Sequence, residues 1–164
     1  RPVAVAETAG GQNDQEAVVR LRQNGQDNIS VSFYRVDDYA GAIDGLQPGQ
    51  AGYAAATAAR AYQVAAGGSS VSGPGYGNYA QAVLQHVDAG DLIAMALTNS
   101  SSGDVFWAFS QANEKVGGQS VGHLWNYGLN TWGWEDVHGG GDHDFNDLVV
   151  QLDFTSKAGH GWLV

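Results

Sequence analysis

Alternating apolar and polar residues recur along the chain and predict β-strands. Between residues 16 and 23, Val19 and Leu21 alternate with arginines, as in a strand whose successive side chains point to opposite faces. The run ISVSFYRV at residues 29–36 also reads as a strand. Further strands are expected at residues 91–98, 105–110, 121–127 and 146–154, whereas residues 79–87 are compatible with a strand or a helix.

Two segments interrupt this pattern. Residues 51–64 are dominated by alanine, the residue with the highest helix propensity, and predict a helix. Residues 67–78, GGSSVSGPGYGN, form a long glycine-serine loop, and loops of this length in a compact domain are usually functional or mobile. Strands separated by glycine-rich turns predict a mainly β, β-sandwich-like single domain over residues 1–164, with a short helical insert and long Gly-rich loops.

Composition and charge argue against several classes of binding protein. The chain has 164 residues, of which 43% are hydrophobic, as expected of one folded domain. The net charge of -10 argues against binding to nucleic acid or to an anionic membrane surface. The absence of cysteine excludes a disulfide framework and a thiolate metal site.

No apolar run approaches the ~18 residues of a membrane-spanning helix, so membrane insertion is not expected. The first residues, RPVAVAETAG, lack the apolar stretch of a signal peptide. Either a signal was removed or the sequence is a domain of a longer chain, and we favour the second interpretation.

The strongest chemical signal is the acidic run within residues 132–154. Five carboxylates and an asparagine amide lie around three consecutive glycines, with no basic residue inside the run to pair with the acids. The candidate metal ligands are Glu135, Asp136, Asp142, Asp144, Asn146 and Asp147. Crowded, unpaired carboxylates favour a hard cation with several oxygen ligands, and calcium fits best. The alternative is a solvated acidic turn.

Other site chemistries fit less well. The run from Asp142 resembles the start of an EF-hand loop, but Asp147 occupies the glycine position and the following alternation predicts a strand, not a helix. His123, His138 and His143 lack the spacing of a helical zinc pair, so surface or hydrogen-bonding roles are favoured.

Aromatic residues supply candidate ligand contacts. The tryptophans could form a sugar-stacking platform, but in a β-protein core positions are favoured for them. Tyr76 and Tyr79, in or beside the glycine-serine loop, are the candidate ligand-binding residues. Paired carboxylates could also serve a glycosidase. Here they crowd together as metal ligands would, and no nucleophile elbow or phosphate loop is present, so an enzyme is not expected.

Two stretches resemble a known family. The sequence GWEDVHGGGDHDFNDLVV (residues 133–150) resembles the signature of a calcium-dependent domain of large bacterial RTX adhesins, and residues 32–61 are similar to its first half. The family includes the peptide-binding domain of ice-binding and cell-attachment adhesins. The resemblance implies that the five acids of the run are calcium ligands, with Asn146 next to them. Trp134 stands where the family usually has phenylalanine.

The resemblance also implies a function. We expect an extracellular, calcium-dependent ligand-binding module on the surface of a bacterium, within a larger adhesin, which binds the C-terminal end of peptides from surface proteins of other cells. An open coordination position on calcium would accept the peptide carboxylate. The alternatives are a calcium-dependent lectin and a structural spacer whose calcium is fully enclosed.

Overall fold

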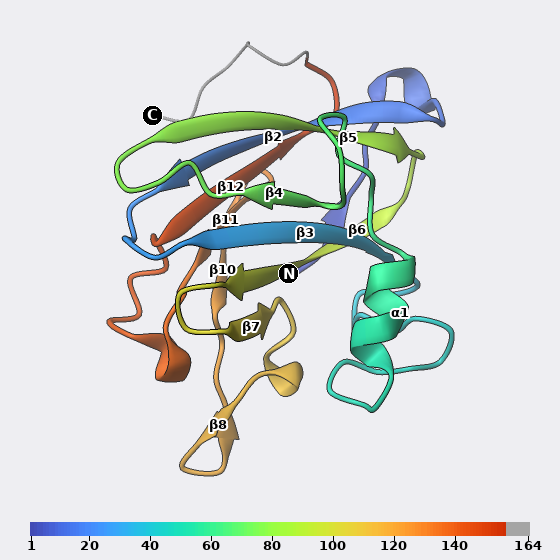
Figure 1. Cartoon of the computed structure of the whole chain (residues 1–164). Helices are drawn as coiled ribbons and strands as arrows, with labels where there is room; N and C mark the ends of the chain where they lie inside the picture. Colours follow the sequence, from blue (N-terminus) through green and yellow to red (C-terminus); the bar gives the residue numbers. More distant parts are fainter. Residues whose placement is uncertain (157–164) are drawn as a thin grey trace.

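The computed structural model describes residues 1–156 and contains two antiparallel five-stranded sheets (Figure 1). One sheet has the order β1 (Ala4–Val5), β6 (Leu92–Asn99), β3 (Ile29–Val36) and β4 (Ser70–Ser72), with β7 (Asp104–Trp107) also paired to β6. The other has the order β10 (Leu124–Gly128), β11 (Thr131–Trp134), β12 (Leu148–Asp153), β2 (Gln15–Gln23) and β5 (Tyr79–Val87).

The smaller elements lie between these strands. They are a hairpin of β8 (Lys115–Val116) and β9 (Gln119–Ser120), the helix α1 (Tyr53–Ala59), and short 3-10 turns at Ala9–Gly11, Ser110–Ala112 and His138–Gly140. The expected mainly β, β-sandwich-like fold with a short helix is confirmed. The ambiguous residues 79–87 form a strand, and the long loop expected at residues 67–78 is interrupted by β4, which pairs with β3. No helix within residues 1–156 has both the length and the apolar character needed to cross a membrane.

The helix is shorter than residues 51–64, the range that alanine content predicts. It ends at Ala59 because the next two residues interact with other parts of the fold. Ala61 forms a β-bridge with Tyr34 of β3, and the Arg60 guanidinium pairs with Asp37 and Asp44. Tertiary pairing therefore overrides helix propensity at this end.

The core lies between the two sheets. In the second sheet, Leu21 of β2 stands opposite Val150 of β12, which stands opposite Trp132 of β11. In the first sheet, Phe33 of β3 stands opposite Met95 of β6. All five side chains are buried in one hydrophobic cluster, and burial of each such side chain contributes about 1.5–3 kcal/mol.

Strand pairing fixes the position of the acidic run. Trp134 at the end of β11 pairs with Leu148 at the start of β12, so residues 135–147 form the loop that connects two neighbouring strands. Leu148 in turn pairs with Gln23 at the end of β2. The β2–β3 loop, residues 24–28, therefore begins directly beside the acidic loop.

Candidate metal centre

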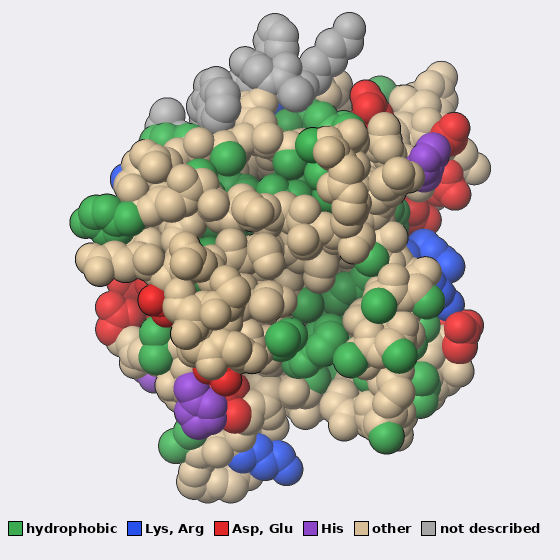
Figure 2. Space-filling view, in the orientation of Figure 1, with side chains coloured by type: hydrophobic (Ala, Val, Ile, Leu, Met, Phe, Trp, Pro, Cys, Tyr) green, Lys and Arg blue, Asp and Glu red, His purple; other side chains and the backbone are tan. Residues whose placement is uncertain are grey.

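The β11–β12 loop gathers acidic side chains at one end of the second sheet (Figure 1, orange-red). Figure 2 shows carboxylates and a histidine together on this part of the surface. Carboxylate oxygens of Glu135, Asp142 and Asp144 all lie within 4.8 Å of one another. Glu135 is buried, whereas Asp142 and Asp144 are exposed. We call these three residues the acidic triad.

The backbone of the loop holds the triad in place. His143 and Phe145 adopt left-handed conformations, with φ of 60° and 51°, between and after the two aspartates. Phe145 donates its backbone N–H to Glu135 Oε1 at 2.6 Å, and Asp144 donates its N–H to Asp142 Oδ1 at 3.3 Å. The rings of His143 and Phe145 lie 6.3 Å apart, centroid to centroid. The three acidic side chains of the loop therefore lie together, and the rings of His143 and Phe145 form a separate pair.

A glycine in β11 allows the loop to close against the sheet. A Cβ at Gly133 would lie 1.7 Å from the Phe145 carbonyl oxygen and 2.6 Å from the Tyr127 ring. The Tyr127 hydroxyl donates to the carbonyl oxygens of Asp144 and Phe145, at 3.0 and 3.1 Å. The lack of a side chain at Gly133 therefore lets the loop that carries the acidic triad pack against β11.

The charged state of the loop is unfavourable without a cation. Burial raises the pKa of Glu135 to about 8, and the nearby Asp147 carboxylate adds to the rise. Burial likewise raises the pKa of Asp136 to about 7, with contributions from Asp147 and Asp27. An oxygen-seeking cation would favour the ionised forms of the same groups.

Asp136 and Asp147 form a second pair beside the triad. Asp136 donates its N–H to Asp147 Oδ2 at 3.1 Å, and Asp147 donates its N–H to the Trp134 carbonyl at 3.0 Å. The Asn146 carbonyl accepts from the Asn24 side-chain amide at 2.8 Å. The structure thus gathers three of the six candidate ligands in the triad and places Asp136, Asn146 and Asp147 towards the β2–β3 loop. Their role as metal ligands stays a prediction.

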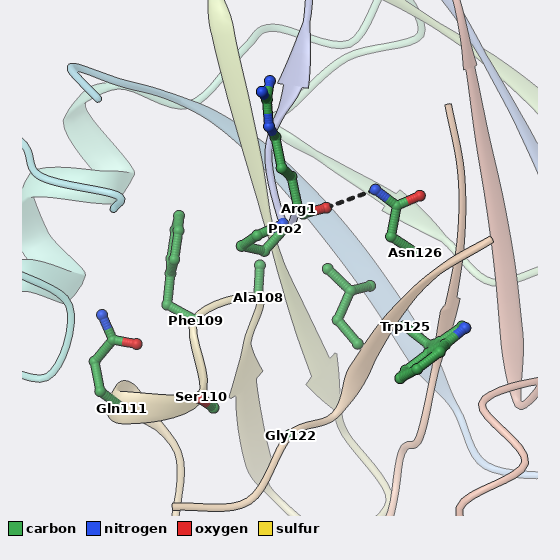
Figure 3. A pocket seen from close by; sticks show the side chains of 10 residues that line it. Arg1, Pro2, Ala108, Phe109, Ser110, Gln111, Gly122, Trp125 and Asn126 are labelled. Carbon is green, nitrogen blue, oxygen red and sulfur yellow. Dashed lines mark hydrogen bonds between the residues drawn. The ribbon is translucent and has the colours of Figure 1, made fainter. Parts of the chain in front are cut away.

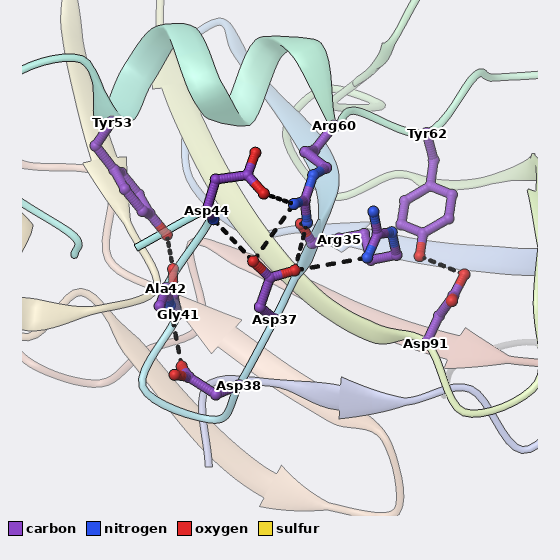
Figure 4. Close-up of polar contacts among 10 residues, drawn as sticks. All are labelled: Arg35, Asp37, Asp38, Gly41, Ala42, Asp44, Tyr53, Arg60, Tyr62 and Asp91. Carbon is purple, nitrogen blue, oxygen red and sulfur yellow. Dashed lines mark hydrogen bonds and ion pairs between the residues drawn. The ribbon is translucent and has the colours of Figure 1, made fainter. Parts of the chain in front are cut away.

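Some acids elsewhere in the described residues are paired with arginine. Asp37 and Asp44, in the loop before α1, both pair with Arg60, at 2.8 and 3.0 Å (Figure 4). Hydrogen bonding from Arg60 holds the pKa of Asp37 below its ordinary value. The triad has no arginine in this role among the ion pairs of residues 1–156. Its chemistry therefore differs from that of an ordinary ion-pair network.

The β8–β9 hairpin supports the glycine run. Glu114, just before β8, accepts the Gly139 N–H at 2.7 Å and lies 2.9 Å from His123 Nε2. His123 is fully buried, and its Nδ1 lies 2.9 Å from the Glu135 carbonyl. The expected hydrogen-bonding role of His123 accords with these contacts. Sequence reasoning missed Glu114, because its position beside Gly139 follows from the packing of the hairpin.

An apolar groove runs beside the triad. It measures about 500 Å³ and is lined by residues of β10, the β8–β9 hairpin and the acidic loop. Its apolar and ring side chains are Val116, Val121, Leu124, Trp125, His143 and Phe145. The Trp125 and Phe145 rings lie 5.9 Å apart, and 55% of Trp125 is exposed. We call this hollow the aromatic groove. Phe145 lines the groove and also donates its backbone N–H to Glu135 of the triad.

A second hollow shares residues of β10 with the aromatic groove. It measures about 450 Å³, and Figure 3 shows Phe109, Pro2 and Trp125 around it. Gly122, Leu124 and Trp125 line both hollows. Trp125 therefore stands between two recesses. By contrast, Trp132 and Trp134 are fully buried, as expected for core tryptophans in a β-protein.

Tyr76 and Tyr79 lie apart from the triad. Tyr79 begins β5 and contacts Arg22, whose guanidinium lies 4.8 Å from the ring centroid and donates to the hydroxyl. Tyr76 is 66% exposed. Within residues 1–156, no hydrogen bond or ring contact joins either tyrosine to residues 135–147. The aromatic groove is the nearer candidate surface, and sequence alone does not separate exposed Trp125 from buried Trp132.

One comparison with known proteins gave a match. Residues 82–155 match a family model described as a domain of unknown function, DUF4114. The match covers less than half of the chain and runs from β5 through β12, so it includes the whole acidic loop. No curated protein and no solved structure matches the chain.

Proposed function

We propose that the chain is a calcium-dependent ligand-binding module of a bacterial cell-surface adhesin. It acts outside the cell, is not an enzyme, and binds the C-terminal ends of peptides from surface proteins of other cells. The observation that carries the proposal is the acidic triad at the side of the aromatic groove. The similarity of residues 133–150 to the adhesin signature supports the same function.

The donor set suits calcium. Calcium takes six to eight oxygen ligands in flexible geometry, whereas magnesium demands a small octahedral site. The triad offers three carboxylates, one buried and two exposed. A cation held by the exposed pair would retain coordination positions facing solvent, and a ligand carboxylate is suited to fill one.

The groove would supply the rest of the affinity. A peptide whose terminal carboxylate reaches the ion can place apolar or aromatic side chains against Trp125 and Phe145. Burial of apolar area drives such contacts, and aromatic pairs add about 0.5–1.5 kcal/mol. No arginine is needed to hold the carboxylate, which suits a chain with only seven lysines and arginines.

A calcium-dependent lectin is the second candidate, because Trp125 is 55% exposed and its ring lies 5.9 Å from that of Phe145 in the acidic loop. An exposed indole can stack on a sugar ring while sugar hydroxyls coordinate the ion. A structural spacer is the third candidate, in which protein oxygens enclose calcium completely.

A paired binding screen separates these functions. Peptides with a free C-terminus, the same peptides amidated, and a glycan array are each tested with calcium and with EGTA. We expect binding of free-carboxylate peptides in calcium only, and its loss on amidation. Glycan binding without peptide binding would overturn the proposal in favour of the lectin, and no binding to either would favour the spacer.

Three variants locate the contact surface. Trp125→Ala removes the exposed ring of the aromatic groove and is expected to abolish peptide binding. Val105→Ala trims an exposed residue of β7 that does not line the groove and is the matched control. Tyr76→Ala tests the glycine-serine loop: loss of binding there, with Trp125→Ala unaffected, would place the ligand at the loop instead.

A further inference from the structure

Strand β10 is an edge strand of the second sheet. Within residues 1–156 it pairs with β11 and with no other strand, and Trp125 and Tyr127 on it are more than half exposed. An edge strand presents unpaired backbone N–H and C=O groups to any chain that can pair with them. In β10, Leu124 pairs with Trp134, the residue before Glu135. The free edge therefore begins beside the candidate metal centre.

The pairing of β10 with β11 determines which backbone groups are free. The His123 carbonyl accepts the Glu135 N–H at 2.8 Å, and hydrogen-bonded pairs alternate with non-bonded pairs along two antiparallel strands. The backbone groups of Trp125 therefore face β11, whereas those of Leu124 and Asn126 point away from it. Outside the pairing with β11, no hydrogen bond within residues 1–156 uses the backbone N–H or C=O of Leu124 or Asn126. Both residues thus offer a donor and an acceptor along the edge.

Two hollows lie along this edge. The aromatic groove and the second hollow both include Leu124 and Trp125 in their walls, and the second hollow also includes Asn126. Successive side chains of a strand point to opposite faces, so Trp125 lies on one face of β10 and Leu124 and Asn126 lie on the other. Trp125 contacts the Phe145 ring on its face, while Figure 3 shows Phe109 across the second hollow from Trp125. An extended segment beside β10 would therefore place alternate side chains in the two hollows.

We propose that the ligand peptide binds as an additional antiparallel strand on the free edge of β10, with its C-terminus towards the acidic triad. An extended polypeptide is the ligand chemistry that this edge selects, because its own N–H and C=O groups alternate with the spacing of those on β10. In such strand addition, main-chain hydrogen bonds provide affinity and pockets for alternate side chains provide specificity. The inference rests on the proposed peptide binding and specifies how the peptide is held.

The direction of the added strand follows from the position of the triad. β10 runs away from the acidic loop, from Leu124 beside Trp134 to its last residue, Gly128. A peptide whose terminal carboxylate reaches the triad runs towards that loop, so it is antiparallel to β10. Peptide residues opposite Leu124 and Asn126 exchange backbone hydrogen bonds with them, whereas the residue opposite Trp125 directs its own N–H to solvent.

A series of N-methylated peptides tests the pairing from the ligand side. The parent is the free-carboxylate peptide that binds most tightly in calcium in the screen above, and each derivative carries one backbone N-methyl group, which removes one N–H donor. We expect the dissociation constant, measured by titration calorimetry, to rise about tenfold at every second residue of the paired stretch. At the residues between, a change of about twofold or less is expected, because their N–H groups face solvent.

Two substitutions at one position test the pairing from the protein side. Asn126→Pro removes the outward N–H, and proline is tolerated in an edge strand where that N–H bonds nothing in the sheet. Asn126→Ala keeps the N–H but loses the same side-chain bonds, to the Arg1 carbonyl and from the Gly128 N–H, so it is the matched control. We expect Asn126→Pro to weaken peptide binding about tenfold and Asn126→Ala about twofold or less. Circular dichroism checks that both variants fold.

The outcomes separate this inference from the proposed function. Peptide binding in calcium without alternation in the N-methyl series, or equal binding by Asn126→Pro and Asn126→Ala, would overturn strand addition and leave the proposed function standing. Absence of binding by the unmethylated peptides would refute both. If Asn126→Pro does not fold, the N-methyl series decides alone.

Discussion

At the scale of single residues, Gly133 shows how one missing side chain builds the triad. The Phe145 carbonyl occupies the space where a Cβ would stand, and the Tyr127 hydroxyl donates to the same carbonyl. Sequence reasoning cannot detect this requirement, because a glycine between two tryptophans reads as an ordinary strand position. The contact exists only after the loop has folded back.

Gly133→Ala is therefore expected to destabilise the protein by about 3 kcal/mol, at the upper end of typical overpacking costs, because the obstacle is backbone. It should also weaken calcium binding, since the Phe145 N–H holds Glu135. Gly122→Ala is the control: its Cβ would meet nothing within 4 Å. Urea unfolding of both variants is the measurement, and equal midpoints would contradict the role of Gly133.

Asp144 is the residue whose loss should matter most for calcium binding by the triad. Asp144→Ala removes one of the three triad carboxylates and should abolish the stabilisation by calcium bound there, about 2.7 kcal/mol at 100 times the dissociation constant. Glu16→Gln should retain it. Thermal melts with calcium and with EGTA measure the difference. A full calcium shift in Asp144→Ala would make Asp144 a solvated surface acid.

The pH dependence follows from Glu135 and Asp136. Their pKa values rise from 4.5 and 3.8 to about 8 and about 7 in the folded chain. The folded metal-free protein thus retains protons that the unfolded chain releases, so its stability is greatest below pH 4 for these groups and falls towards pH 8. Calcium should remove this fall, because it replaces the protons.

Denaturant unfolding at several pH values between 4 and 8 measures how the stability of the protein depends on pH. Glu135→Gln, which cannot ionise, should show a weaker fall in EGTA. A metal-free stability that rises across this range in the wild-type chain would refute the assignment.

At the scale of elements, the loop is held by a hairpin that sequence reasoning did not foresee. β8 and β9 are only two residues each and show no alternation. Longer strands such as β2, β3 and β12 could be predicted because one buried face imposes a period of two. Alanine content predicts too long a helix, because it does not show that Ala61 bridges to Tyr34.

Glu114→Gln tests the link between the hairpin and the glycine run. The change removes a charged acceptor from Gly139 N–H and His123, and hydrogen bonds to charged groups contribute about 1.5–3 kcal/mol. We expect a loss of stability in this range both with calcium and with EGTA, since Glu114 lies outside the acidic triad. A loss seen only with calcium would instead make Glu114 part of the metal centre.

At the scale of the whole molecule, two sheets bring distant acids to one end. The sequence predicts the β11–β12 acids as a cluster because they are close in the chain. The link from Asp27 to the Asp136 carbonyl through Asn99 could not be predicted, since it forms only when β6 and the acidic loop come together in the fold. The core position favoured for the tryptophans is wrong for Trp125, which is 55% exposed, because exposure depends on how β10 sits at the sheet edge.

A crystal structure with calcium and a free-carboxylate peptide tests most directly whether the triad holds calcium and whether that ion binds the peptide carboxylate. Anomalous scattering would locate the calcium. We expect an ion at about 2.3–2.6 Å from oxygens of Glu135, Asp142 and Asp144, with the peptide carboxylate in its coordination shell and Trp125 beside the peptide. An ion enclosed by protein oxygens alone, or a triad without an ion under saturating calcium, would contradict it.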